Sequence, residues 1–206
     1  MKPVDKKIYL ASKSPRRREL LRQIGIDFEL LLLRSDGPRG ADVTEDVIPG
    51  ETPAVYVARV AREKAAFAYT LVLRRHLMPR AVLSADTTVT LDGDILGKPA
   101  NPNEAKAMLQ RLSGRTHQVL TSVAVHHADF AGQVTQVSDV RFCTLSQAAI
   151  DAYCATQEPY DKAGGYGIQG LAAQFIEHIE GSHSGIMGLP LFETVQLLRQ
   201  AGLPLP

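Results

Sequence analysis

Three consecutive arginines, at positions 16 to 18, stand where a helix least favours positive charge. Ser14 suits the N-cap of a helix and Pro15 its first position, so the arginines fall in the first turn. Each cation there is unfavourable by roughly 0.3 to 1 kcal/mol unless an anion lies opposite. Free backbone N–H groups, the hydroxyls of Ser12 and Ser14 and the guanidinium groups together favour a bound phosphate. The alternative is a solvated basic face, which Arg18 in particular would fit.

Stability and binding should depend on Arg17 in opposite directions. A cation at the positive end of a helix destabilises the free protein, whereas its bond to a phosphate strengthens the complex. Replacing Arg17 by Ala is therefore expected to weaken triphosphate binding while leaving or raising the thermal stability of the free protein.

One carboxylate and two lysines could complete a phosphate site. Asp86 follows the apolar run 81–85, at the end of a predicted strand, where burying a carboxylate is costly unless it binds a cation or transfers a proton. Lys98 follows a glycine that permits close approach of the backbone, and Lys64 lies in a helical charge run. Asp86 could instead cap the turn after it, and the lysines could be ordinary surface groups. Together these residue types suit phosphate chemistry assisted by a divalent cation.

Residues 161–170 hold four glycines and formally match Gly-x-Gly-x-x-Gly. A dinucleotide-binding fingerprint must follow a strand and open a helix, but here a polar stretch precedes the match and a strand-like run follows it. We therefore reject an NAD-dependent enzyme. Backbone N–H groups in this loop could still bind an anion, and the amide of Gln169 has the donors and acceptors to recognise a nucleobase. An ordinary turn residue is the equal alternative for Gln169.

Composition and missing motifs exclude several other functions. The 23 Lys and Arg against 22 Asp and Glu give a net charge of +1, so neither a nucleic acid polymer nor an acidic membrane is an expected partner. No window approaches the roughly 18 apolar residues of a membrane span, and we expect a soluble, cytoplasmic protein. The two cysteines have no metal-ligand spacing, and no Gly-x-Ser-x-Gly elbow supports a serine hydrolase.

Strands and helices interleave along the whole sequence, which predicts an α/β architecture. The expected strands are residues 7–11, 28–33, 81–85, 89–91, 119–126, 133–144 and 171–179, and the expected helices are residues 15–23, 53–75, 104–112, 146–155 and a last one after 190. The polar segment 34–52 is predicted to be a loop of the length that lids have. Phe192, Val195, Leu197 and Leu198 should form the apolar face of the last helix. No linker divides the chain, so a single domain over residues 1–206 is expected.

Seven motifs resemble, in their order along the chain, the Maf family of nucleoside triphosphate pyrophosphatases. They are 12–17 (Ser-Lys-Ser-Pro-Arg-Arg), 62–65 (Arg-Glu-Lys-Ala), 84–87 (Ser-Ala-Asp-Thr), 98–99 (Lys-Pro), 112–117 (Leu-Ser-Gly-Arg-Thr-His), 161–170 (Asp-Lys-Ala-Gly, then Tyr-Gly-Ile-Gln-Gly) and 188–190 (Gly-Leu-Pro). The resemblance implies a mixed, curved central sheet with flanking helices and two lobes around a deep cleft, a Maf/ITPase-like fold. It also implies a homodimer.

The same resemblance implies a reaction. A nucleoside triphosphate would be hydrolysed between its α and β phosphates, giving the monophosphate and pyrophosphate in the presence of Mg²⁺ or Mn²⁺. Thr87 and the Gly-Ile-Gln-Gly loop resemble the branch that acts on dTTP and UTP rather than the branch that acts on 7-methyl-GTP. The implied role is a house-cleaning one, the removal of excess or modified pyrimidine nucleotides.

Site residues follow from the matching positions. Asp86 would accept the proton of the attacking water and contact the metal. Nucleotide preference would depend on Arg16, Thr87 and Gln169. The phosphates would be bound by Ser12, Ser14, Arg17, Lys64 and Lys98.

Two positions depart from the family pattern. The acidic pair usual after the second strand reads Asp36-Gly37 here, inside a long loop, so Asp36 is the expected second metal contact, with Asp42 and Glu45 as alternatives. His183 replaces an aromatic residue near the carboxyl end.

A non-catalytic, nucleotide-binding regulator of septum formation and cell division is the rival function. Asp86 together with Lys64 and Lys98 favours the enzyme, because a pure binding protein has no need of a positioned acid.

Overall fold

The computed structural model describes residues 7–34 and 40–205. Its strands are β1 (Ile8–Leu10), β2 (Phe28–Leu30), β3 (Val82–Leu91), β4 (Asp94–Leu96), β5 (Thr116–His127), β6 (Phe130–Phe142) and β7 (Ile176–Glu180). Its α-helices are α1 (Pro15–Gln23), α2 (Pro53–Arg74), α3 (Pro102–Leu112), α4 (Gln147–Cys154), α5 (His183–Ile186) and α6 (Leu191–Gln200), with 3₁₀ turns η1 (Pro159–Asp161), η2 (Ala163–Gly165) and η3 (Leu171–Phe175). None of these helices has the length and apolar character needed to cross a membrane.

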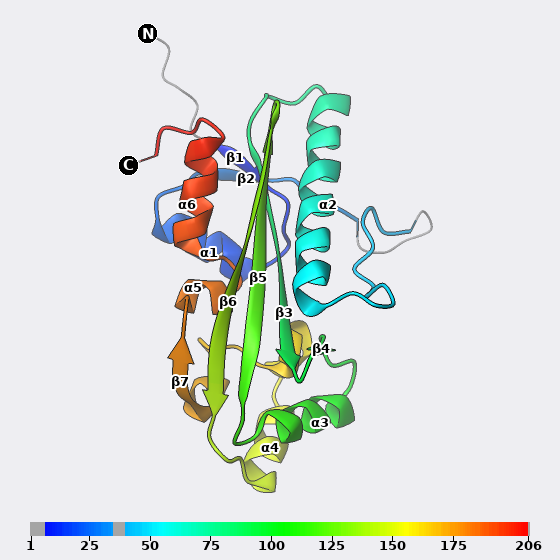
Figure 1. The fold of residues 1–206 in the computed structure, drawn as a ribbon, viewed down its shortest axis with the longest axis vertical. Helices are drawn as coiled ribbons and strands as arrows, with labels where there is room; N and C mark the ends of the chain where they lie inside the picture. The colour runs from blue at the N-terminus through cyan, green and yellow to red at the C-terminus, as the bar shows by residue number, and fades with distance from the viewer. Residues whose placement is uncertain (1–6, 35–39, 206) are drawn as a thin grey trace.

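The strands of this part of the chain form one open, mixed sheet in the order β2-β1-β3-β5-β6-β7, with β4 paired to β3. β1 runs parallel to β2 and β3, and the other pairs are antiparallel. Figure 1 shows β5 and β6 running almost the whole length of the molecule, with helices at both ends. The expected mixed sheet with flanking helices is therefore confirmed.

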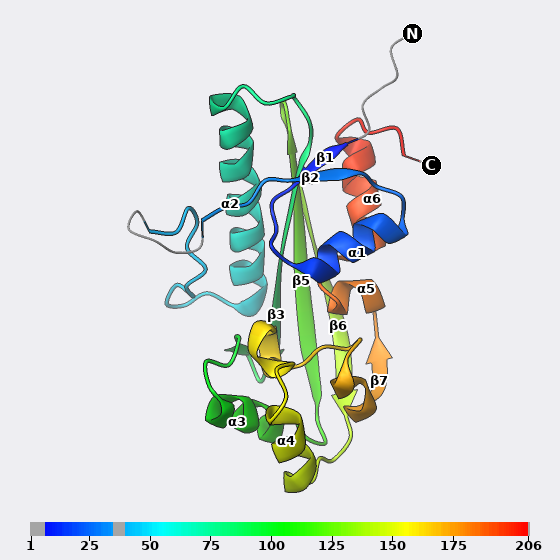
Figure 2. The ribbon, with the colours of Figure 1, turned by 180° about the vertical axis from the view of Figure 1, so that it is seen from behind.

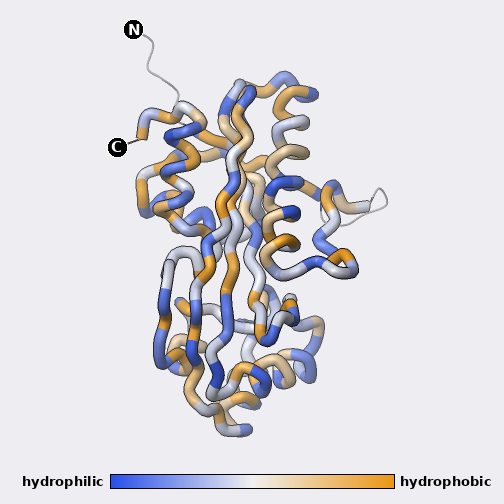
Figure 3. The backbone as a smooth tube through the Cα atoms, viewed as in Figure 1, coloured by the Kyte–Doolittle hydropathy of each residue, from blue (hydrophilic) through white to orange (hydrophobic). Residues whose placement is uncertain are grey.

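Each end of the long strands has its own hydrophobic core. At one end, α1 and α6 pack on one face of the sheet through Leu21 and Leu198, while α2 packs on the opposite face through Ala68 (Figures 1 and 2). At the other end, Leu109 of α3 and Ile150 of α4 pack with Phe142. Figure 3 shows hydrophobic and hydrophilic residues interspersed along the central strands, as expected where only some positions face a core.

The sheet is incomplete beside the middle of β3. β1 pairs with β3 only as far as Leu83, and β4 pairs with it only from Val89 onward. The β3 edge between these two residues has no strand partner on that side in the described chain, whereas β5 pairs continuously on the other side. This interruption lies at the carboxyl end of β1, where α/β sheets bind ligands.

The predicted strand break at residues 86–88 is wrong. β3 is continuous, and Asp86 lies in its middle, opposite Ser122 of β5. The polar residues that suggested a turn, Asp86 and Thr87, point instead toward α2 and α1 on opposite faces, because successive side chains alternate along a strand.

Two further expectations near the carboxyl end are corrected. Residues 171–175 are 3₁₀ turn η3 rather than strand, and β7 begins only at Ile176. The carboxylate of Glu158 accepts the backbone N–H groups of Leu171 and Ala172, which are then unavailable to a strand ladder. Phe192 is 74% exposed rather than part of the apolar face of α6.

A buried histidine beside Phe142, in the core that α3 and α4 cover, predicts that the stability depends on pH. His117 is 2% exposed, its Nε2 lies 2.6 Å from the hydroxyl of Tyr166, and burial lowers its pKa to about 4. In the unfolded chain the pKa of this histidine is near 6.5, so below that pH protons bind the unfolded state more readily than the folded one. The folded protein therefore keeps its full stability above pH 6.5 and loses part of it as the pH falls toward 4. Between pH 7 and 4.5, the unfolding free energy should fall by about 2 kcal/mol more in the parent than in His117→Gln. Urea titrations at both pH values test this, and equal losses would contradict it.

Candidate active site

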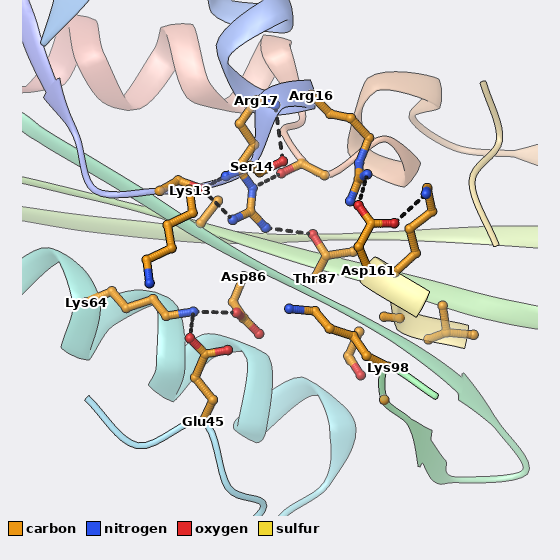
Figure 4. A pocket seen from close by; sticks show the side chains of 18 of the residues that line it. Lys13, Ser14, Arg16, Arg17, Glu45, Lys64, Asp86, Thr87, Lys98 and Asp161 are labelled. Atoms are coloured by element: carbon orange, nitrogen blue, oxygen red, sulfur yellow. Dashed lines mark hydrogen bonds and ion pairs between the residues drawn. The ribbon is translucent and has the colours of Figure 1, made fainter. Parts of the chain in front are cut away.

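Nine of the predicted site residues line one cavity of about 1040 Å³ between the two ends of the molecule. They are Ser12, Ser14, Arg16, Arg17, Lys64, Asp86, Thr87, Lys98 and Gln169. The volume is at the upper end of the range for small-molecule sites and is sufficient for a nucleotide. Figure 4 shows most of these side chains converging from α1, α2 and β3. The tenth, Asp36, lies outside the described residues.

The amino end of α1 has the predicted capping structure. The hydroxyl of Ser14 accepts the backbone N–H of Arg17 at 3.4 Å, and that of Ser12 accepts the N–H of Ser14 at 3.2 Å. Pro15 is the first helical residue. The helix therefore begins at the cavity wall, with its positive dipole end at the cavity.

Arg17 is bound by neutral oxygen atoms on three sides. Its Nε donates to the carbonyl of Gly188 at 2.7 Å, and its two terminal nitrogens donate to Ser12 Oγ and Thr87 Oγ1, each at 3.1 Å. Burial lowers the pKa of the guanidinium, while nearby Asp86 acts in the opposite direction. No described carboxylate lies within ion-pair distance of it. This partly uncompensated positive charge favours an anion in the cavity.

These contacts change the expectation for Arg17. From the sequence, the cation lies at the helix end without a partner, and its removal was expected to cost the free protein nothing. The structure joins α1, β3 and the Gly188 turn through this one side chain. Removing it would leave the buried carbonyl of Gly188 without this donor, and an unpaired buried acceptor destabilises a protein.

Arg16 reaches across the cavity mouth to the other end of the molecule. Its Nη1 lies 3.1 Å from the carboxylate of Asp161 in η1, which also pairs with Lys162. Asp161 was not among the predicted site residues, although it belongs to the recognised motif at 161–164. Its position fixes the direction in which Arg16 points (Figure 4).

Two carboxylates meet at one lysine on the α2 side of the cavity. Lys64 Nζ lies 2.9 Å from Asp86 Oδ1 and 2.8 Å from Glu45 Oε1. Asp86 is 7% exposed. Burial raises the pKa of Glu45, but Lys64, Lys98 and Arg17 more than offset this and lower it overall. The site thus holds two acids in a cationic surrounding.

The structure also distinguishes between the alternatives to Asp36. Arg34 donates to Asp42 from its backbone and from its side chain, both at 2.8 Å, and Asp42 does not line the cavity. Glu45 lines it and faces Asp86 (Figure 4). In the described residues no group of three or more His, Cys, Asp or Glu forms a metal site. A cation here would need phosphate oxygens in addition to these two carboxylates, which is the usual arrangement for Mg²⁺.

Sequence reasoning missed Tyr56 and Lys13, which also line the cavity. The hydroxyl of Tyr56 donates to the backbone carbonyl of Glu45 at 2.9 Å. Its position eight residues before Lys64, about two helical turns, is the signal that could have suggested it. Lys13 lies between the two predicted serines.

The opposite wall of the cavity comes from the loop of residues 161–170, which holds four glycines. Tyr166, Gly167, Ile168 and Gln169 line the cavity, and Tyr166 is anchored by its bond to His117. A Cβ at Gly167 would lie 2.9 Å from the side chain of Lys162, so a larger residue there would require that lysine to shift. Gln169 is exposed at the cavity, where its amide can meet a ligand.

Several known proteins are similar to this chain. A solved structure, the Staphylococcus aureus Ham1 protein, gives a TM-score of 0.49 at 14% identity, over 96% of this chain and 100% of that one. A protein of Aromatoleum aromaticum named dTTP/UTP pyrophosphatase is 56% identical over 100% of both chains. One of the same name from Ralstonia nicotianae is 54% identical over 96% of this chain and 95% of its own. The family model for Maf-like proteins matches residues 7–201, and the chain belongs to the Maf family.

Proposed function

We propose that this protein is a nucleoside triphosphate pyrophosphatase that hydrolyses dTTP and UTP to the monophosphate and pyrophosphate. The observation that carries the proposal is the buried Asp86 in the middle of β3, where that strand has no partner on one side in the described chain. Asp86 lines one cavity with Arg17, Lys64 and Lys98. An acid that faces a cationic cavity suits proton transfer during phosphoryl chemistry. The names of relatives that match the whole chain support the substrate class.

These positions support the following reaction. The cationic and hydroxyl groups at the start of α1, with Lys64 and Lys98, bind the triphosphate. The carboxylate of Asp86 takes a proton from water while the water oxygen bonds to the α-phosphorus. The bond from that phosphorus to the bridging oxygen breaks, and pyrophosphate leaves with the electron pair. Charge on the leaving group is offset by the surrounding cations.

A divalent cation fits the carboxylates that are present. Asp86 and Glu45 both reach Lys64 Nζ within 3 Å, so their oxygens are close enough together to share one positive charge. We propose that these two residues hold Mg²⁺ or Mn²⁺ together with substrate oxygens. When bound, the ion would neutralise part of the negative charge on the phosphates of the substrate. Asp36 stays a prediction, as it lies outside the described residues.

A panel of nucleoside triphosphates tests the proposed function. Each is incubated with the protein and Mg²⁺, and pyrophosphate and orthophosphate are measured separately. We expect one pyrophosphate per nucleotide and the highest kcat/KM for dTTP and UTP. Binding of these nucleotides without turnover would support the rival, a non-catalytic regulator. We also propose a cytoplasmic homodimer from the family resemblance, and light scattering of the purified protein tests its mass.

Gln169 should determine part of the base preference. Its amide presents a donor and an acceptor, which complement O4 and N3–H of uracil or thymine. In Gln169→Glu the side chain only accepts, so O4 loses its donor while the amino group of cytosine gains an acceptor. The ratio of kcat/KM for UTP over CTP should fall by about 10-fold or more, because an unpaired buried polar group costs about 1–3 kcal/mol.

The matched control is Gln174→Glu, the same change at an exposed position that does not line the cavity. This variant should keep the parent ratio. An unchanged ratio in Gln169→Glu would place base recognition elsewhere in the cavity.

A further inference from the structure

Residues 40–52 cover the α2 side of the cavity without forming a helix or strand. Thr44, Glu45, Asp46 and Val47 of this segment line the cavity. Backbone hydrogen bonds of regular structure do not fix their position, so it depends on side-chain contacts with neighbouring elements. Those contacts come mainly from α2.

Arg59 makes more hydrogen bonds with this segment than any other residue of α2 does. Its Nε donates to Glu51 Oε1 at 2.6 Å, and its Nη2 donates to Glu51 Oε2 at 3.0 Å, a two-point ion pair. The same Nη2 donates to the backbone carbonyl of Asp46 at 2.8 Å. Glu51 also accepts the backbone N–H of Ile48 at 3.0 Å, so its carboxylate folds the segment as well as anchoring it.

The ion pair is built as an interior contact rather than a surface one. The side chains of Arg59 and Glu51 are 10% and 9% exposed. The pKa of Arg59 is raised well above its usual value, chiefly by its hydrogen bond to Glu51. Two parallel bonds between planar groups fix their relative orientation, and a buried pair is strongly sensitive to loss of either partner.

Two consecutive backbone carbonyls are thereby attached to one helix. Arg59 binds that of Asp46 and Tyr56 binds that of Glu45. The side chain of Glu45 then extends to Lys64, two turns further along the same helix. Three residues of α2 therefore fix both the backbone and the carboxylate of Glu45 relative to this helix: Tyr56, Arg59 and Lys64.

We propose that Arg59 and Glu51 are positioning residues that hold residues 45–51 on α2 so that the carboxylate of Glu45 faces Asp86. The proposal rests on the proposed function for the role of Glu45 in catalysis, but the placement of the segment can be measured independently. Arg59 acts through Glu45 and does not line the cavity.

Arg59→Lys is the main test, since it keeps the positive charge near the site and removes the planar two-point contact. Hydrogen exchange of the backbone amides in residues 40–52 should become faster, while exchange in β3 and β5 stays at the parent rate. With UTP and Mg²⁺, kcat should fall by about 10-fold or more, since displacements near 1 Å can cost about 100-fold. KM should change less than about threefold. Glu51→Gln should reproduce both effects with the same side-chain shape.

A double mutant separates positioning from a general loss of structure. If Arg59 acts through Glu45, Arg59→Lys should slow a Glu45→Gln enzyme by less than about twofold, because effects that share one partner are not additive. Arg62→Lys is the control, an exposed arginine on the same helix outside the cavity, and should behave as the parent.

Unchanged exchange of residues 40–52 in Arg59→Lys, or full additivity with Glu45→Gln, would overturn the proposal. A different result is also informative: exchange of residues 40–52 becomes faster in Arg59→Lys, but Glu45→Gln has the parent activity. This would support the role of Arg59 in holding the segment and would contradict the proposed role of Glu45 in catalysis. The two ideas can therefore fail separately.

Discussion

Replacing Asp86 by Asn is expected to reduce kcat for UTP by about 10²- to 10⁴-fold, the usual loss when a general base is removed. The amide of Asn is not basic enough to accept a proton from water and binds a divalent cation poorly. The variant should fold, because β3 pairs with β5 through backbone groups that the substitution does not alter. Lys64 also keeps an acidic partner, since Glu45 lies 2.8 Å from its Nζ.

Pyrophosphate release measures the rate, and circular dichroism with a thermal melt shows that the protein is folded. Asp94→Asn is the control, because Asp94 is an exposed acid of β4 that pairs with Arg111 outside the cavity. It should retain the parent rate. A folded Asp86→Asn protein with at least half the parent kcat would exclude Asp86 as the base.

We expect Arg17→Ala to lower both the activity and the stability. A hydrogen bond between a charged group and phosphate contributes about 1.5–3 kcal/mol, so kcat/KM for UTP should fall by about 10- to 150-fold. In the free protein, the buried carbonyl of Gly188 loses its donor, while Thr87 keeps its hydrogen bond to Thr121, and we expect about 1–3 kcal/mol less unfolding free energy. Relief of the buried charge and of the helix dipole offsets part of this loss.

Arg18→Ala is the matched control, from the adjacent position in the same helix turn. Arg18 does not line the cavity, so kcat/KM should stay within about twofold of the parent. If Arg17→Ala instead melts at or above the parent temperature without ligand, the contacts to neutral oxygens contribute little. The unfavourable position of the cation at the positive end of the helix dipole would then dominate its effect on stability.

The amino-acid sequence by itself predicted the bounds of the first helix and nine of the residues that line the cavity. Helix 15–23 was predicted with the bounds that α1 has, because Ser14 and Pro15 mark its start and Gly25 follows shortly after its end. The nine site residues recognised from ordered motifs line a single cavity. Local capping signals and side-chain chemistry are readable along the chain, since neither depends on distant partners.

Only the tertiary structure decided which groups face one another. Asp86 is mid-strand because β5, more than thirty residues later, continues the hydrogen-bonded ladder past it. Of the candidate acids in the loop, Arg34 binds Asp42 whereas Lys64 binds Glu45. The ladder and the Lys64–Glu45 ion pair join residues that are far apart in sequence. Their energies depend on distance and burial, and both are fixed only when the chain has folded.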